Sequence, residues 1–289
     1  MNPFVRFVLA IFPIAGGIFI AIAQPAGANL AILESRTPLS SPEYKQFNLK
    51  QNINFIDGFQ DLNIEGSILI YDSNNQQTYQ HNPDRNITAF SPASTFKILN
   101  SLIALESGAI ANEISVLTWD GVERSFPIWN RDLNLREAFK ISAVWFYQVL
   151  ARRTGYETMK KWVMQANYGN KVIGTQQDID KFWLGGALRI TPQEQIQFLQ
   201  RLYENNVPFS ERTIEIVKDI MIVERTPNYT IRAKTGWDLQ GKIGWYVGYL
   251  ERDENVYFFA VNVDLQDSID LPKRQELMRR SFAKLGLLD

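Results

Sequence analysis

One short stretch decides the fold: Phe90-Ser91-Pro92-Ala93-Ser94-Thr95-Phe96-Lys97-Ile98-Leu99-Asn100. Pro92 is unfavourable inside a helix but favourable just before one, and Ser94 suits a helix cap or a first turn. The apolar residues that follow recur with helical spacing, and Gly108 supplies a stop. The sequence therefore predicts a helix that begins near Ser94 and ends before Gly108.

Ser94 and Lys97 are three residues apart, so their side chains face the same way on a helix. A serine at the positive end of a helix, with an amine one turn behind it, can be an activated nucleophile. A capping serine and a solvent-reaching lysine are the other interpretation, which fits most S-x-x-K matches. The pair alone leaves both interpretations open.

The composition limits the classes of function. The 289 residues, of which 45% are hydrophobic, suffice for one or two lobes with a large core. The net charge of −1 gives no basic face for nucleic acid, so we expect no nucleic-acid partner. There is no cysteine, which excludes disulfides, thiolate catalysis and zinc–thiolate sites.

The histidine content limits the chemistry further. His81 is the only histidine, and its polar surroundings predict an exposed turn. A metal site built on several imidazoles cannot be assembled, so we expect no metal. A Ser-His-Asp triad would need His81 as its base. A lysine or a carboxylate is therefore the expected base of a serine enzyme.

The N-terminal residues 1–28 are predicted to be a secretory signal peptide. Phe7–Ala23 is an almost unbroken apolar run, and Ala26-Gly27-Ala28 supplies a small-residue cleavage site. The run is short for a membrane span and contains Pro13. An uncleaved anchor is the alternative. We expect a mature chain from Asn29 that lies in the periplasm, without stable membrane association after cleavage.

Periodicity predicts strands at both ends of the chain and helices in the middle. No assignment is made for 29–65. The predicted strands are 67–71, 76–79, 230–235, 241–251 and 255–265. The predicted helices after the one at Ser94 are 134–154, 156–165, 191–203, 211–222 and 272–285.

This order predicts an α+β fold. One antiparallel sheet is made from both ends, is flanked by helices and carries an inserted all-helical lobe. The sheet lobe is expected at about 29–90 and 226–289, and the helical lobe at about 91–225. Together they are expected to form one domain, 29–289.

Two later motifs give the S-x-x-K pattern its meaning. Ser142-Ala143-Val144 and Lys234-Thr235-Gly236 accompany Ser94 and Lys97, as in serine β-lactamases and penicillin-binding proteins. The sequence resembles the class D (oxacillinase-type) serine β-lactamases from about Gly66 to the C-terminus. The matching segments are P-A-S-T-F-K, W-D-G, W-N-R-D, S-A-V-W-F-Y-Q, Y-G-N, F-W-L and K-T-G-W.

The resemblance implies a penicillin-recognising fold with its site in a cleft between the lobes. It implies hydrolysis of a small-molecule β-lactam substrate through an acyl-enzyme on Ser94. No cofactor is expected apart from carbon dioxide. The motifs do not indicate an oligomeric state.

A buried Lys97 would have a lowered pKa, because desolvation disfavours the charged amine. The neutral amine could be the base itself, or it could combine with carbon dioxide to form a carbamate. The resemblance implies the carbamate. Val144 would keep the lysine pocket dry, and Trp183 matches the family tryptophan whose indole N–H holds the carbamate. The residues alone favour a core aromatic for Trp183.

The remaining site residues are assigned from the resemblance. Ser142, expected on the long helix 134–154, becomes a relay to the lactam nitrogen. Lys234 adds positive potential, Thr235 binds the substrate carboxylate, and Gly236 lets the substrate approach a strand.

The backbone N–H groups of Ser94 and Trp237 are expected to form an oxyanion hole. Arg274 matches an arginine that pairs with the substrate carboxylate. Phe126 and Leu239 are expected on opposite rims of the cleft, where they would meet over the site. Gly185-Gly186, after F-W-L, departs from the family and is expected to loosen the loop that carries Trp183.

Two other functions share these motifs. An antibiotic sensor would be acylated once and stay acylated, but it needs several membrane spans and a signalling domain. A penicillin-binding D,D-peptidase would act on cell-wall peptides, and Val144 argues against it because that class keeps a polar residue there. In both alternatives deacylation would be slow.

Overall fold

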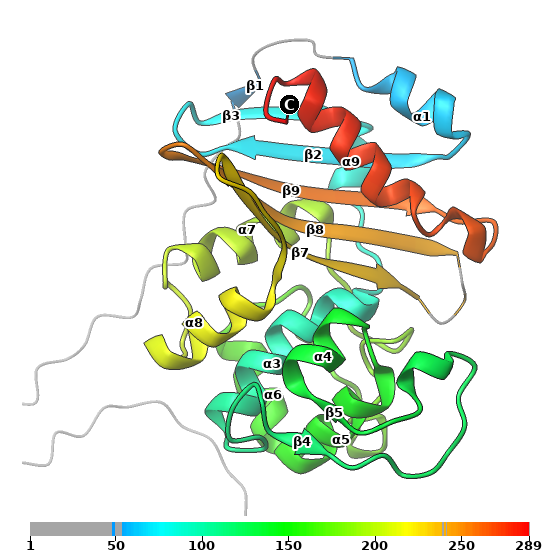
Figure 1. Ribbon diagram of the computed structural model, residues 1–289, viewed down its shortest axis with the longest axis vertical. Coiled ribbons are helices and arrows are strands. Elements are labelled where there is room, and N and C mark those ends of the chain that lie inside the picture. Colours follow the sequence, from blue (N-terminus) through cyan, green and yellow to red (C-terminus); the bar gives the residue numbers. More distant parts are fainter. Residues whose placement is uncertain (1–47, 50–53, 239, 241, 289) are drawn as a thin grey trace, which may run out of the picture. The chain divides into compact units, whose positions relative to one another are not determined.

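Strands from both ends of the chain lie in one sheet at the centre of the fold (Figure 1). The computed structural model describes residues 48–49, 54–238, 240 and 242–288. Within them the sheet has the strand order β1-β3-β2-β9-β8-β7-β6. The strands are β1 Asn48–Leu49, β2 Gly66–Asp72, β3 Gln77–His81, β6 Ile222–Arg225, β7 Tyr229–Trp237, β8 Ile243–Arg252 and β9 Asn255–Asp264. The predicted α+β fold, with one sheet built from both ends, is confirmed.

The sheet departs from the prediction at its edges. β1 pairs with β3 in parallel, so the sheet is not purely antiparallel. β6 pairs with β7 as the other edge strand, where the sequence predicted the end of a helix. A separate two-stranded sheet of β4 (Val116–Leu117) and β5 (Leu133–Asn134) was not predicted.

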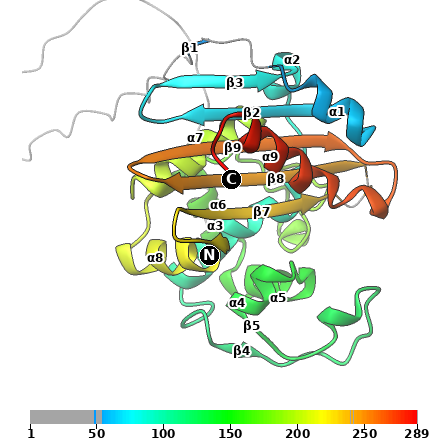
Figure 2. The same ribbon diagram turned by 45° about the horizontal axis from the view of Figure 1, so that its top comes forward.

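Both faces of the sheet are buried. Along β2, Ile68 and Ile70 belong to the core on the side of α9, whereas Leu69 and Tyr71 belong to the core shared with the helical region. Successive strand residues point to opposite faces, so a strand covered on both sides is apolar throughout. Figure 2 shows α9 (Lys273–Lys284) in front of the sheet and α7 (Pro192–Tyr203) behind it.

The helical region lies beyond β7 in Figure 1. Helices α6 and α7 agree with their predictions, and α7 begins with a capping box between Thr191 and Glu194. α8 ends two residues before the predicted end, and α1 lies in the stretch left unassigned. The remaining helices are α1 Ile56–Leu62, α2 Pro83–Asn86, α3 Lys97–Glu106, α4 Leu135–Lys140, α5 Val144–Thr154, α6 Tyr156–Gln165 and α8 Glu211–Ile220.

The predicted continuous helix 134–154 is wrong, because it breaks at Ser142. The Asn134–Glu137 capping box starts α4 as predicted. The chain then closes α4 with two bonds, from Ser142 N–H to the Phe139 carbonyl and from Ala143 N–H to the Ala138 carbonyl. This is the Schellman pattern, in which the residue after the cap is left-handed. Ser142 has that conformation, with φ 61°, where glycine is usual.

Other expectations have mixed outcomes. His81 ends β3 and is half-buried rather than exposed, because its ring stacks on Phe59 with centroids 4.4 Å apart. The predicted signal peptide 1–28 lies outside the described residues. No helix in the described part of the chain is long and apolar enough to cross a membrane. The lobe boundaries stay predictions.

Gly248, on β8, provides a test of sheet packing. A β-carbon there would lie 2.1 Å from the Arg232 carbonyl oxygen of β7 and 2.7 Å from the Ala233 β-carbon. We expect Gly248→Ala to lower the free energy of unfolding by about 1–3 kcal/mol, because the strands must move apart. Urea unfolding measures the loss. Gly108→Ala, at φ +73° in open space, isolates backbone strain, and an equal loss in both variants would contradict the packing argument.

Candidate active site

The predicted nucleophile and base are in direct contact. Ser94 lies in the 3₁₀ turn Ala93–Phe96, and Lys97 is the first residue of α3. Lys97 Nζ is 2.7 Å from Ser94 Oγ. Ser94 lines an open cavity, whereas the Lys97 side chain is fully buried. The structure therefore brings these two residues together as the S-x-x-K spacing predicts.

Lys97 is buried without an acidic partner. No ion pair to a carboxylate joins it within the described residues. Burial alone lowers the pKa of Lys97 from its usual 10.5 to about 7. Nζ lies 5.3 Å from the ring centroid of Tyr147, a residue that was not among the predicted site residues. Close to neutral pH the amine is thus able to hold or release a proton.

The backbone before Ser94 is strained. Ala93 has φ 50°, a left-handed conformation that costs a non-glycine residue energy. The turn is held by Thr95 Oγ1, which donates to the Pro92 carbonyl at 2.7 Å and accepts from Gln195 Nε2 at 2.8 Å. Sequence reasoning missed this support from Gln195, because it comes from α7, far along the chain.

Ser142 and Val144 line the cavity beside Ser94. Ser142 lies in the left-handed break between α4 and α5, not on a helix as predicted. Val144 is the first residue of α5 and packs against the core. The chain changes direction at this break. Ser142 therefore lines the cavity from the break, and Val144 lines it from the start of α5.

β7 supplies the K-T-G motif at the edge of the cavity. Thr235, Gly236 and Trp237 line it, whereas Lys234 is buried behind it with Nζ 5.5 Å from the Phe139 ring centroid. A β-carbon on Gly236 would lie 3.1 Å from Thr95 Cγ2 and 3.2 Å from the Pro92 carbonyl oxygen. Glycine therefore lets β7 pass close to the turn that carries Ser94.

Three basic side chains, Lys97, Lys234 and Arg274, are buried near the cavity, and of these only Arg274 is among its lining residues. Burial lowers the pKa of Lys234 well below its usual value, and the charges of Lys97 and Arg274 lower it further. Burial also lowers the pKa of Arg274 to about 10. Arg274 Nη1 donates to the Gly236 carbonyl, and its Nε is buried without a partner. A cavity wall with uncompensated cations favours an anionic ligand.

Trp183 is fully buried against the nucleophile turn. Its ring stacks on Phe96 with centroids 5.4 Å apart, and its carbonyl accepts from Ser91 Oγ at 3.0 Å. The indole Nε1 has no hydrogen-bond partner. Buried donors normally have partners, so this N–H is available to an acceptor that enters the site.

The expected loosening by Gly185-Gly186 is not what their packing indicates. A β-carbon on Gly186 would lie 2.7 Å from Phe182 Cα and 2.8 Å from the Phe182 carbonyl oxygen. Gly185 has φ 133°, which favours glycine. The two glycines therefore allow a tight turn after Trp183.

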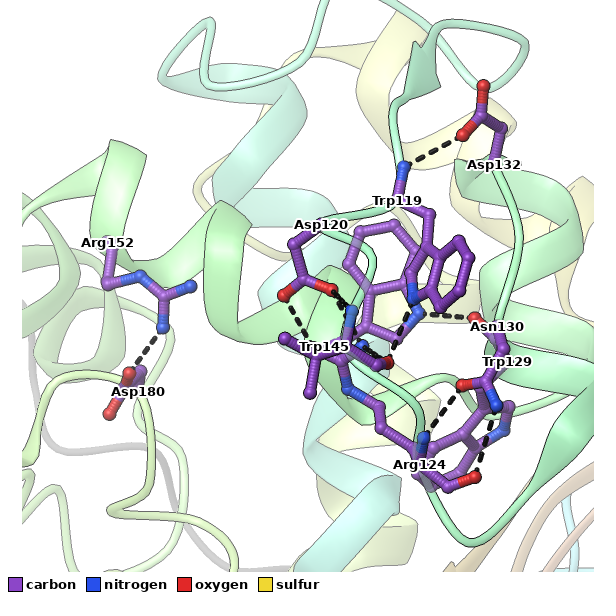
Figure 3. Close-up of polar contacts among 10 residues, drawn as sticks. Trp119, Asp120, Arg124, Trp129, Asn130, Asp132, Trp145, Arg152 and Asp180 are labelled. Atoms are coloured by element: carbon purple, nitrogen blue, oxygen red, sulfur yellow. Dashed lines mark hydrogen bonds and ion pairs between the residues drawn. The ribbon is translucent and has the colours of Figure 1, made fainter.

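The loop 119–132 forms another wall of the cavity, and its fold depends on Arg124 (Figure 3). Arg124 pairs with Asp120 at 2.7 Å, and this bond lowers the pKa of Asp120 to about 2. The Arg124 Cζ lies 5.5 Å from the Trp145 ring centroid. Asn130 Oδ1 accepts from the Arg124 backbone N–H at 3.0 Å. Sequence reasoning named this loop but missed the role of Arg124.

Phe126 lies on this loop, and its ring contacts two tryptophan rings. Its ring is 4.7 Å from that of Trp129 and 6.4 Å from that of Trp237, edge to face. Phe126 is 41% exposed at the mouth of the cavity. Leu239 lies outside the described residues, so the predicted contact between the two rims stays a prediction.

The cavity itself has a volume of about 810 Å³. It is lined by Ser94, Ser142, Val144, Thr235, Trp237 and Arg274, together with the loop that carries Phe126. Lys97, Lys234 and Trp183 are buried and do not line it. No cluster of three metal-ligating side chains occurs among the residues that the structure describes.

The fold and this site define a class of protein. The model of the penicillin-binding protein transpeptidase domain matches residues 64–283. The β-lactamase OXA-48 of Klebsiella pneumoniae is 45% identical over 217 residues, 74% of this chain and 81% of that protein. OXA-20 of Pseudomonas aeruginosa is 40% identical over 90% of this chain and 97% of that protein.

Solved structures agree with these relatives. The class D β-lactamase YbXI from Nostoc has 57% sequence identity and a TM-score of 0.81, covering 82% of this chain and 100% of that chain. FUS-1 (OXA-85) from Fusobacterium nucleatum has 39% identity and a TM-score of 0.79, covering 83% of this chain and 100% of that chain. The chain belongs to the class D β-lactamases, a family of hydrolases.

The burial of Lys97 predicts a pH-dependent stability. Its pKa is lower in the folded protein than in the unfolded chain, so between about pH 7 and 10.5 the unfolded chain binds more protons. The free energy of unfolding then rises with pH, by up to about 1.4 kcal/mol per unit. We expect Lys97→Met, in buffer freed of carbon dioxide, to be more stable than the parent at pH 7. The difference should shrink as the pH rises towards 10.

Urea unfolding of both proteins across this pH range measures the effect. Lys160→Met, at an exposed position of α6, controls for the substitution itself. A difference between Lys97→Met and the parent that stays constant with pH would show that the amine is charged in the folded protein.

Proposed function

We propose that this protein hydrolyses β-lactams through an acyl-enzyme on Ser94, with carboxylated Lys97 as the general base. The observation that carries the proposal is the 2.7 Å contact between Ser94 Oγ and Lys97 Nζ. Lys97 is buried, and no carboxylate pairs with it in the described residues. A serine hydroxyl needs a base within hydrogen-bond reach to become a nucleophile. The relatives named β-lactamases support the choice of substrate.

In acylation, Ser94 Oγ forms an ester bond to the lactam carbonyl carbon as its proton moves towards Lys97. The ring C–N bond breaks, and the ring nitrogen needs a proton. Ser142 lines the cavity beside Ser94 and is the proposed relay for it. The backbone N–H groups of Ser94 and Trp237 are the proposed oxyanion hole, where negative charge develops on the carbonyl oxygen. Water then cleaves the ester in deacylation.

The substrate carboxylate is assigned to the side of the cavity near Thr235, Lys234 and Arg274. Thr235 lines the cavity, with buried Lys234 beside it and Arg274 in the first turn of α9. Burial lowers the pKa of Lys234, and an anion there would offset the further lowering by the charges of Lys97 and Arg274. This electrostatic term would orient the lactam so that its carbonyl faces Ser94.

The lysine pocket fits a carbamate. A neutral Lys97 Nζ can form an N–C bond to carbon dioxide and release one proton. The carbamate, when present, supplies an anionic oxygen base for both acylation and deacylation. Trp183 Nε1 is a buried donor without a partner, and it is the proposed donor to a carbamate oxygen. The ring of Tyr147, with its centroid 5.3 Å from Lys97 Nζ, is an apolar wall of the pocket, and Val144 is proposed to keep the pocket dry.

We also propose that residues 1–28 direct export and are removed, which leaves a periplasmic enzyme. The support is the apolar run Phe7–Ala23 before Ala26-Gly27-Ala28. N-terminal sequencing of the protein from a periplasmic extract tests this, and an N-terminus at Met1 would contradict it.

The nucleophile assignment predicts a covalent adduct. We expect the intact mass to rise by the mass of the penicillin soon after mixing, and then to return to that of the free protein as the ester is hydrolysed. Ser94→Ala should show no adduct and should lower kcat by about a millionfold. An adduct in Ser94→Ala would contradict the assignment. A stable adduct in the parent, without turnover of nitrocefin, would instead indicate a sensor or a D,D-peptidase-like protein.

The carbamate assignment predicts activation by bicarbonate. Activity should rise with added bicarbonate, most at acidic pH, where the carbamate loses carbon dioxide. Trp183→Phe keeps the ring stack but removes the indole N–H, so it should need about ten- to hundredfold more bicarbonate. Activity that is equal with and without bicarbonate, in both proteins and across pH, would identify the free amine as the base.

A further inference from the structure

We propose that Gln148, Arg152 and Asp180 are positioning residues that hold Trp183 in place and thereby set the affinity of Lys97 for carbon dioxide. This inference rests on the proposed carbamate. It concerns residues that touch neither the substrate nor Lys97. Their effect would pass through the backbone of one short turn.

The three residues connect α5 to that turn. Val144, Gln148 and Arg152 are spaced by four, so they follow one face of α5. Val144 at its start lines the cavity. One turn on, Gln148 Nε2 donates to the Asp180 carbonyl at 3.2 Å. After another turn, Arg152 Nη1 pairs with Asp180 Oδ2 at 2.5 Å (Figure 3).

Asp180 is part of the turn that carries Trp183. The N–H groups of Lys181 and Phe182 both bond to the Asp178 carbonyl at 2.9 Å. On the far side of the turn, Ser91 Oγ donates to the Trp183 carbonyl at 3.0 Å. The turn is thus attached to α5 through Asp180. It is attached to the stretch that carries Ser94 through the Trp183 carbonyl.

These two attachments determine where the indole lies, and the orientation of its N–H decides how well it can bond to a carbamate oxygen. Its ring plane is fixed by the stack on Phe96, with an interplanar angle of 26°. Its Nε1 is buried and unpaired, and under the proposed function its acceptor is an oxygen of the carbamate on Lys97. A hydrogen bond weakens steeply with misalignment, so a small shift of the turn would weaken binding of the carbamate.

The expected effect of the ion pair alone is modest. The side chains of Arg152 and Asp180 are 50% and 26% exposed, and exposed pairs contribute little because water screens them. We expect Arg152→Ala to raise the bicarbonate concentration for half-maximal carbamate formation about threefold. Gln148→Ala removes a bond to backbone, and the double variant should reach about tenfold.

The measurement is the carbamate signal itself, by carbon NMR with ¹³C-labelled bicarbonate, titrated in the full protein without substrate. Arg153→Ala is the matched control, because Arg153 is the next residue of α5 and is exposed, without an ion pair in the described residues. It should leave the titration unchanged. Arg152→Lys keeps the charge and should lie between Arg152→Ala and the parent.

The outcomes separate this inference from the proposed function. If the parent shows no carbamate signal, the proposed function is wrong about the base. If the parent shows the signal and the double variant titrates identically, the positioning role is wrong. A lower melting temperature with an unchanged titration would also overturn it, because the contacts would then be merely structural. If the double variant does not fold, the two single variants decide.

Discussion

The burial of one amine without a counter-charge is the constraint on which this structure depends. An amine taken from water into an apolar site loses hydration, and Lys97 Nζ recovers a hydrogen bond with Ser94 and a contact with the ring of Tyr147. Its pKa falls to about 7 as a result. A nearby carboxylate would have stabilised the ammonium and removed its capacity as a base. The packing of Phe96, Tyr147 and Trp183 around α3 therefore keeps the pKa of Lys97 low, and the burial of this amine lowers the stability of the fold.

The same logic extends to the cavity wall. Lys234 and Arg274 are also buried, and no carboxylate pairs with them in the part of the chain that the structure describes. Burial lowers the pKa of Lys234, and the charges of Lys97 and Arg274 lower it further, so an anion in the cavity would relieve an unfavourable concentration of positive charge. Arg274 reaches the wall from the last helix and Lys234 from β7. Both segments belong to the C-terminal part of the chain, and β7 packs against the turn that carries Ser94, so the site joins segments that are far apart in sequence.

Strained backbone marks the places where tertiary packing overrides local preference. Ala93 and Ser142 both have left-handed conformations, and both adjoin the cavity. In each case contacts with other elements stabilise the strained conformation. Gln195 of α7 supports the turn at Ser94, and the start of α5 packs after the break at Ser142. Such strain persists only where the surrounding structure over-determines the conformation.

The sequence by itself determined the five longer strands of the sheet, most helices and the pairing of Ser94 with Lys97, because hydrophobic period, caps and i,i+3 spacing are local properties. It did not predict the short strands β1, β4, β5 and β6. It predicted one long helix through Ser142, since serine there carries no signal for a left-handed stop. Only the tertiary structure decided that break, the unpaired indole of Trp183 and the contacts of Arg124 and Arg152. These features depend on which residues, distant in sequence, meet when the helices pack onto one sheet, and local periodicity contains no information about that.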